Sequence, residues 1–180
     1  MSGGASLRAG TWEQAEAMIG EVVATFQGAD PVSEADIRRK LEVIGFDCPL
    51  HYDEAVARDH GYDTIVSPVS MTRVWAMPAY WRPGEERIGT ASMTTPIPAS
   101  SVPGEGDTMI ATRVRWEHLA PLYPGDRVSL TAVLKSVTRK TTRIGTGAFF
   151  VIESTYRNQD ELIVAVETVT LFRFDRLEPA

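Results

Sequence analysis

The stretch VSLTAVLK, residues 128–135, alternates in its side chains in a way that decides the fold. One side carries apolar residues throughout, whereas the other side is mostly polar. A period of two over eight residues is typical of a β-strand that buries one face. The residues of the apolar side are Val128, Leu130, Ala132 and Leu134.

Strands are also predicted over much of the rest of the C-terminal half. Residues 108–116, 149–156 and 162–174 also have the composition of strands, and 108–116 shows the same alternation. Turn residues stand between strands at Pro124-Gly125-Asp126 and at Asn158-Gln159-Asp160. The sequence therefore predicts four consecutive strands joined by hairpin-type connections, which is an antiparallel meander.

The N-terminal half is read mainly as helices. Residues 12–19 predict a short helix, and residues 21–26 predict a strand. Ser33 is placed to cap a helix that ends near Gly45, and Asp53 to cap a second one over residues 54–60.

A third, apolar helix is predicted over residues 67–80, with Pro78 ending it. Residues 81–107 are rich in Pro, Gly, Ser and Thr and predict a long irregular segment. Helices followed by a run of strands indicate an α+β fold, here expected as a single domain over residues 1–180.

Composition limits the possible functions. The chain has 180 residues, 43% of them hydrophobic, which is enough for a substantial core. A net charge of −6 argues against nucleic acid as a partner. With one cysteine, no apolar signal core at the N-terminus and no apolar run of membrane-spanning length, we expect a soluble cytoplasmic protein.

A short motif carries the chemistry. Residues 44–54 read IGFDCPLHYDE, and Gly61-Tyr62 follows a few residues later. This stretch resembles the hydratase motif of MaoC-like enoyl hydratases and (R)-3-hydroxyacyl dehydratases, whose pattern is Gly-Asp-x-Asn-Pro-(Leu/Ile)-His. The matching positions are Gly45, Pro49, Leu50, His51, Asp53 and Gly61-Tyr62.

Other segments extend the resemblance over most of the chain. Residues 65–68 (IVSP) resemble the family's entry to its central helix, and Pro124-Gly125-Asp126 resembles a turn of the family. Residues 155–159 (TYRNQ) resemble a late strand of the fatty-acid-synthase-type N-terminal dehydratase domain. The resemblance implies a hot-dog fold, in which an antiparallel sheet wraps around a long central helix.

The resemblance also implies an activity. In the family, an Asp and a His hold the water that adds to an enoyl thioester, and a backbone N–H at the start of the central helix stabilises the oxyanion. The substrate is a thioester of coenzyme A or of an acyl carrier protein, and no cofactor or metal is needed. No paired ligand spacing among His51, His60 and His118 points to a metal site.

This chain departs from the motif at the acid. Phe46 stands where the family has its Asp, and Cys48 stands in place of the Asn. His51 is the remaining catalytic candidate, and Asp47 is a weaker one as a displaced acid. The alternative for His51 is a structural role, in which it bonds a buried carbonyl and fixes the loop. Cys48 is interpreted as a small filler.

Further candidates would bind the substrate. Phe46, Met71 and Trp75 are candidates to line an acyl pocket, although Met71 and Trp75 at helical spacing are also typical of a core. Arg139, Lys140 and Arg143, near Lys135, are candidates to contact the phosphates of coenzyme A or an acidic carrier protein. A second basic cluster, 38–40, offers the same chemistry, and for both clusters a solvated surface is the alternative.

These observations lead to one main hypothesis and two alternatives. The chain is predicted to be the non-catalytic subunit that binds the acyl tail, a fatty or steroid group, in a heteromeric dehydratase-hydratase, beside a second hot-dog subunit with an intact Asp/His motif. One alternative is an active homodimeric hydratase that uses His51 with Asp47 or Asp53. The other is an acyl-thioester binding protein without catalysis.

Overall fold

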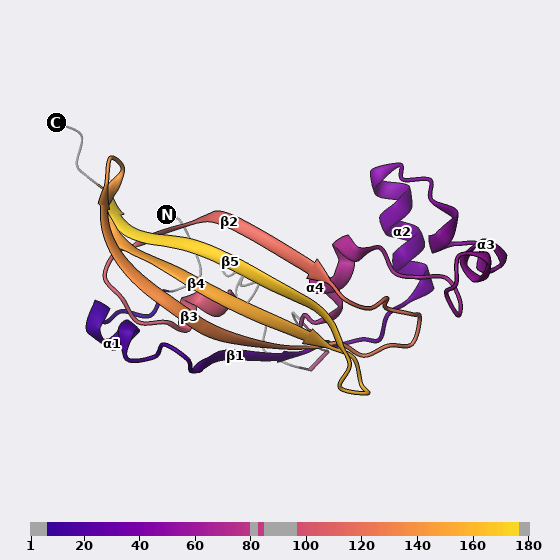
Figure 1. Ribbon diagram of the computed structural model, residues 1–180, viewed down its shortest axis with the longest axis horizontal. Coiled ribbons are helices and arrows are strands. Elements are labelled where there is room, and N and C mark those ends of the chain that lie inside the picture. Colours follow the sequence, from indigo (N-terminus) through magenta and orange to yellow (C-terminus); the bar gives the residue numbers. More distant parts are fainter. Residues whose placement is uncertain (1–6, 80–82, 85–96, 177–180) are drawn as a thin grey trace.

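The computed structural model describes residues 7–79, 83–84 and 97–176 (Figure 1). The strands are β1 (Val22–Gln27), β2 (Thr108–His118), β3 (Ser129–Thr142), β4 (Gly145–Arg157) and β5 (Ile163–Arg176). The α-helices are α1 (Trp12–Glu16), α2 (Glu34–Ile44), α3 (Glu54–Asp59) and α4 (Thr72–Trp75). Short 3₁₀ turns are η1 (Pro49–His51), η2 (Val69–Met71) and η3 (Pro98–Ser101).

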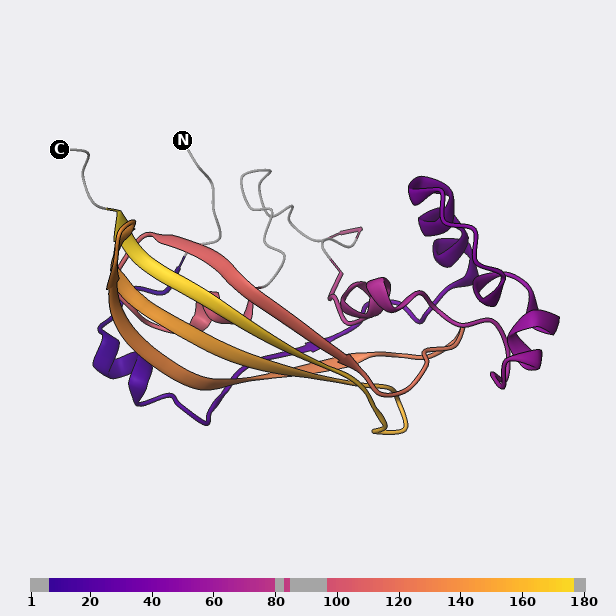
Figure 2. The same ribbon diagram turned by 45° about the horizontal axis from the view of Figure 1, so that its top comes forward.

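The strands form one curved antiparallel sheet in the order β1-β3-β4-β5-β2 (Figure 2). Burial alternates along β4, where every second residue from Ala148 to Tyr156 is buried. Leu130, Leu134 and Phe172 are buried as well. The structure thus has the alternation of buried and less buried side chains that the sequence predicts for strands. The α+β class and the antiparallel sheet are confirmed.

The connection between β2 and β3 differs from the expected hairpin. β2 pairs with β5, at the far side of the sheet from β1. The N–H groups of Leu119 and Ala120 both donate to Val164 O, which keeps the chain beside β5 after β2 ends. The turn at Gly125 then donates to Val32 O, so β3 starts next to β1 instead. These long-range bonds are the physical reason that the meander prediction is wrong at this step.

Two helices begin and end where the sequence indicated. Ser33 Oγ accepts from the N–H of Asp36 at the start of α2, and Gly45 ends the helix with φ of 60°. Asp53 Oδ1 accepts from the first N–H groups of α3. Figure 1 shows both helices beyond one end of the sheet, away from the described C-terminal end of β5.

Two other helices are shorter than expected. α1 ends at Glu16, and a turn carries the chain to Gly20, whose N–H donates to Leu134 O at 2.8 Å. The expected central helix over residues 67–80 is reduced to η2 and α4, so that "long" is wrong for this chain, and Tyr80 lies outside the described residues.

A close backbone contact explains why α4 stops at Trp75. A Cβ on Gly28 would lie 1.9 Å from Trp75 O, so the chain directly after β1 packs against the end of the helix. Ala29 N also donates to Met77 O at 3.0 Å, and Pro78 disfavours a helical Met77. The helix therefore ends against the backbone of a distant segment.

The core lies on the concave side of the sheet. Trp12 packs edge-on against Phe150, with ring centroids 6.1 Å apart, and Ala99 and Val102 around η3 are fully buried. Of the segment expected to be irregular, residues 97–107 contain η3, while 81–82 and 85–96 lie outside the described residues. Within the described ranges, no helix has the length and apolar character needed to span a bilayer.

Candidate functional site

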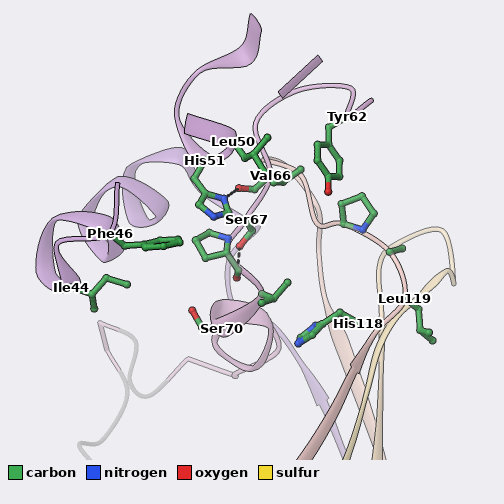
Figure 3. A pocket seen from close by; sticks show the side chains of 14 residues that line it. Ile44, Phe46, Leu50, His51, Tyr62, Val66, Ser67, Ser70, His118 and Leu119 are labelled. Carbon is green, nitrogen blue, oxygen red and sulfur yellow. Dashed lines mark hydrogen bonds between the residues drawn. The ribbon is translucent and has the colours of Figure 1, made fainter. Parts of the chain in front are cut away.

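A groove of about 700 Å³ opens where α2, η1, η2 and the end of β2 meet (Figure 3). Three separate parts of the chain build it: the motif loop, the segment before α4, and the segment after β2. Its lining consists of Ile44, Phe46, Leu50, His51, Tyr62, Val66, Ser67, Pro68, Val69, Ser70, His118, Leu119, Ala120 and Pro121.

Backbone hydrogen bonds hold the motif loop against the segment before α4. After Gly45, the N–H of Phe46 donates back to Leu41 O, which turns the chain out of α2. Pro49 starts η1, and Leu50 O then accepts from Val66 N at 3.0 Å. The shape of this wall thus depends on the residues that the sequence shares with the hydratase motif.

His51 is fixed by one ring nitrogen. Its Nδ1 lies 2.8 Å from Val66 O, and a carbonyl oxygen only accepts, so Nδ1 carries the proton. In the tautomer with the proton on Nδ1, Nε2 carries the lone pair, and the side chain lines the groove. The carbonyl bond expected for a structural role is present, and the second nitrogen remains available for a proton.

An aromatic ring stands where the resemblance to the hydratase motif leads us to expect an acid. Phe46 is 48% exposed, lines the groove and places its ring centroid 5.9 Å from that of His51. Asp47 accepts a hydrogen bond from the Tyr52 hydroxyl, which raises the pKa of that tyrosine. Asp53 is used as the cap of α3.

No carboxylate side chain therefore lines the groove within the described part of the chain. The structure places neither Asp47 nor Asp53, the two candidates for a displaced acid, in the lining. Within the same residues, no cluster of three or more His, Cys, Asp or Glu side chains is arranged to hold a metal ion.

Met71 and Trp75 lie under the groove and not in its lining. Both are buried in the hydrophobic core, so for them the core alternative holds. Trp75 still acts on the site, because its Nε1–H donates to Ser67 Oγ at 2.8 Å. Ser67 in turn donates its backbone N–H to Leu122 O, so this wall is tied to both the core and the segment after β2.

The basic residues expected to contact a phosphate lie elsewhere. Arg139 forms ion pairs with Glu13 at 2.6 Å and with Glu16 at 2.9 Å. Lys140 and Arg143 are exposed at the tip of the β3–β4 hairpin, which Figure 1 shows at the opposite end of the sheet from α2 and α3. These residues do not belong to this chain's groove.

His118 belongs to the groove and was considered from the sequence only as a metal ligand. It ends β2, and its ring stacks on Trp116 at 5.5 Å between centroids with 2° between the planes. Partial burial lowers its pKa below the usual value. His118 lies opposite Ala165 in the register of β2 and β5. The sequence alone does not reveal this register.

A second feature missed from the sequence is an ion pair between a buried carboxylate on β5 and an arginine on α4. Glu167 on β5 is 2% exposed and accepts from Arg73 on α4 and from the Tyr156 hydroxyl, the latter at 2.8 Å. Burial and the neighbouring carboxylate raise the pKa of Tyr156. This network ties α4 to the sheet directly after the groove wall.

Similarity to known proteins agrees with this architecture. A family model described as the dehydratase domain region of FAS1-like proteins matches residues 17–167. The probable enoyl-CoA hydratase alpha subunit of Thermomonospora curvata is 34% identical over 82% of this chain and 46% of its own length. The 3-oxo-4,17-pregnadiene-20-carboxyl-CoA hydratase alpha subunit of Mycobacterium tuberculosis is 32% identical over 67% of this chain and 38% of its own.

Among solved structures, a chain of the ChsH1-ChsH2 complex from Mycobacterium tuberculosis superposes with a TM-score of 0.70 and 26% identity, covering 93% of this chain and 90% of that one. The chain spans less than half the length of the two curated relatives. Similarity to solved structures, including the chain of the ChsH1-ChsH2 complex, confirms the expected hot-dog fold. The chain belongs to the FAS1-like dehydratase domain family.

Proposed function

We propose that this chain is the non-catalytic, acyl-tail-binding subunit of a heteromeric 3-hydroxyacyl/enoyl thioester dehydratase-hydratase. One observation carries the proposal. The groove keeps the shape and the histidine of the hydratase motif, but an aromatic ring stands in place of the acid. The names of both curated relatives, each an alpha subunit of a hydratase, support it.

The chemistry explains why the acid matters. Hydration adds the oxygen of water to the β-carbon and a proton to the α-carbon, and dehydration reverses both steps. The reaction needs a group that takes the proton of water and a group that returns one. The described lining offers His51 for one of these roles and no carboxylate for the other. We propose that no cofactor takes part, because the thioester itself activates the α-carbon.

The groove suits an acyl group. Apolar side chains from three parts of the chain, including Ile44, Phe46 and Leu119, line it and are about half exposed. Apolar surface of this kind is stabilised by covering it with hydrocarbon, at about 25 cal/mol per Å². We propose a long or bulky acyl chain as the occupant, carried by coenzyme A or by a carrier protein.

The partner in this proposal is a second hot-dog subunit that supplies the intact Asp/His pair. β2 is an edge of the sheet, and Ile110 and Val114 on it are exposed. A long strand edge with apolar side chains favours pairing with another chain. The solved complex of two different chains that resembles this protein supports the same arrangement. A cytoplasmic location remains a prediction.

The test is an assay of the purified chain, first alone and then with a hot-dog protein that carries the intact motif. Alone, we expect binding of a long acyl-CoA and no hydration of crotonyl-CoA or of a longer enoyl-CoA. With the partner, we expect hydration. Rapid hydration by the chain alone that disappears in His51→Ala would overturn the proposal.

Such a result would favour the alternative of an active homodimer, which the position of His51 in the groove lining supports. Binding of acyl-CoA without any hydration, even with a series of intact-motif partners, would instead indicate a binding protein.

A further inference from the structure

We propose that His118 recognises an uncharged oxygen of the acyl group, a hydroxyl or a keto oxygen, from the wall of the groove that faces His51. The groove would then select oxygen-bearing acyl chains over plain hydrocarbon chains of the same length. This inference rests on the proposed function, because it assumes that an acyl thioester occupies the groove.

Strand register places His118 on the same face as the core. His118 pairs with Ala165 across β2 and β5, and Ala165 pairs with Tyr156 across β5 and β4. Residues directly opposite each other on neighbouring strands project to the same side of a sheet. Tyr156 is fully buried on the concave side, so the imidazole also projects to that side. Figure 3 shows it on the wall across from His51.

A column of aromatic rings holds the imidazole in place. It lies parallel to the indole of Trp116, which packs 5.2 Å from the ring of Tyr156. Tyr156 is anchored through its hydroxyl to Glu167. A side chain that is supported in this way loses little freedom when it binds a ligand, which lowers the cost of binding.

The hydrogen bonds of the three histidines differ. His51 and His60 each place Nδ1 2.8 Å from a backbone carbonyl, of Val66 and of Val56 respectively. Among the side-chain hydrogen bonds of the described residues, those of histidine rings involve His51 and His60, and none involves His118. As far as the described residues show, both nitrogens are thus left for a molecule in the groove.

The surroundings favour an uncharged oxygen over a carboxylate. Glu117 and Arg115 pair with each other at 3.1 Å, and as the neighbours of Trp116 in the strand they project to its other face. Partial burial lowers the pKa of His118, so near neutral pH the ring has one donor and one acceptor. Leu119 and Ala120 in the same wall are apolar, so an acyl chain lying on them would exclude water and strengthen a hydrogen bond to His118.

The experiment compares three thioesters of one chain length: dodecanoyl-CoA, 3-hydroxydodecanoyl-CoA and dodecanoyl-CoA with a hydroxyl at the chain end. Dissociation constants are measured by calorimetry for the wild type, His118→Phe and His118→Gln. The ratio between a hydroxylated ligand and the plain one isolates the hydrogen bond, because any general gain or loss of apolar contact cancels.

In the wild type, one hydroxylated ligand should bind roughly fivefold to tenfold more tightly than the plain one, the size expected of one hydrogen bond. Which of the two does so tells whether the oxygen sits near the thioester or at the tail. His118→Phe should abolish the ratio, and His118→Gln, whose amide both donates and accepts, should keep part of it. The control His60→Phe, outside the groove, should leave it unchanged.

Each outcome decides something different. If the wild type binds none of the thioesters, the proposed function is wrong and this inference fails with it. If it binds all three equally, only the role of His118 is refuted. The same holds if the ratio survives in a folded His118→Phe protein. Should the Phe variant fail to fold, an undiminished ratio in His118→Ala would serve as the refutation.

Discussion

Arg73→Met should destabilise the protein strongly, because it removes the cation from a buried pair. Glu167 is 2% exposed, and its described partners are Arg73 and the Tyr156 hydroxyl. Leaving a buried charge without its partner costs about 3–5 kcal/mol. The Arg73 side chain is 37% exposed, so solvent already screens part of the attraction and the Tyr156 bond persists. We therefore expect a loss of about 2–3 kcal/mol in the free energy of unfolding.

Urea unfolding measures this loss. With a slope of about 2–3 kcal/mol per molar urea, the midpoint should fall by about 1 M. Arg38→Met is the matched control, since Arg38 pairs with Glu42 on the exposed surface of α2 and should cost less than about 0.5 kcal/mol. In a double-mutant cycle with Glu167→Gln, the coupling should be about 1–2 kcal/mol.

The same change should loosen one wall of the groove. Arg73 lies on α4, directly after the segment that contains Ser70, and the N–H of Met71 donates to Pro68 O there. Hydrogen exchange of the Met71 amide should be faster in Arg73→Met than in Arg38→Met. If both variants unfold at the same urea concentration and exchange alike, the buried pair does not hold α4 and the reasoning is refuted.

Three further predictions concern other contacts. Gly28→Ala would bring a Cβ within 1.9 Å of Trp75 O, so overpacking should cost about 2–3 kcal/mol in urea unfolding, and an unchanged midpoint would contradict the contact. Trp75→Phe removes the N–H donor of Ser67 Oγ and should cost about 1 kcal/mol, read from the melting temperature; no change would mean that the bond is not formed. Hydrogen bonding by Arg139 lowers the pKa of Glu13 from 4.5 to about 2. A carboxyl whose pKa is lower in the folded state stabilises above its unfolded pKa and loses this as the pH falls. Arg139→Gln should therefore be less stable than the wild type at neutral pH, with a difference that shrinks between pH 4.5 and 2; a difference independent of pH would refute it.

Local chemistry explains which features could be predicted. A cap such as Ser33 or Asp53 bonds to the next few N–H groups. The start of the helix can therefore be predicted from adjacent residues alone. Gly45 is similar, because the left-handed conformation that ends α2 needs only the glycine itself. The alternation of 128–135 is equally local, and it becomes the start of β3.

The features that escaped prediction depend on contacts between distant residues. α4 ends where the backbone of Gly28 contacts it, and the residues around position 75 carry no sequence signal for that contact. β2 pairs with β5 because of bonds to Val164 O, and only this pairing brings His118 to the concave face. Asp47 could be recognised as a neighbour of the missing acid, but its bond to Tyr52 depends on the shape of the folded loop.

The bonds around the motif explain how an acid can be lost while the groove persists. Its wall is held by Val66 N to Leu50 O, by His51 Nδ1 to Val66 O, and by the turn at Gly45. The side chain at position 46 makes none of these bonds, so replacing an acid there by Phe46 leaves the frame intact and adds apolar surface to the lining. In this fold the residue that would perform the chemistry is thus separable from the residues that make the shape. If the proposed function is correct, a subunit whose partner performs the catalysis is able to change the first and must keep the second.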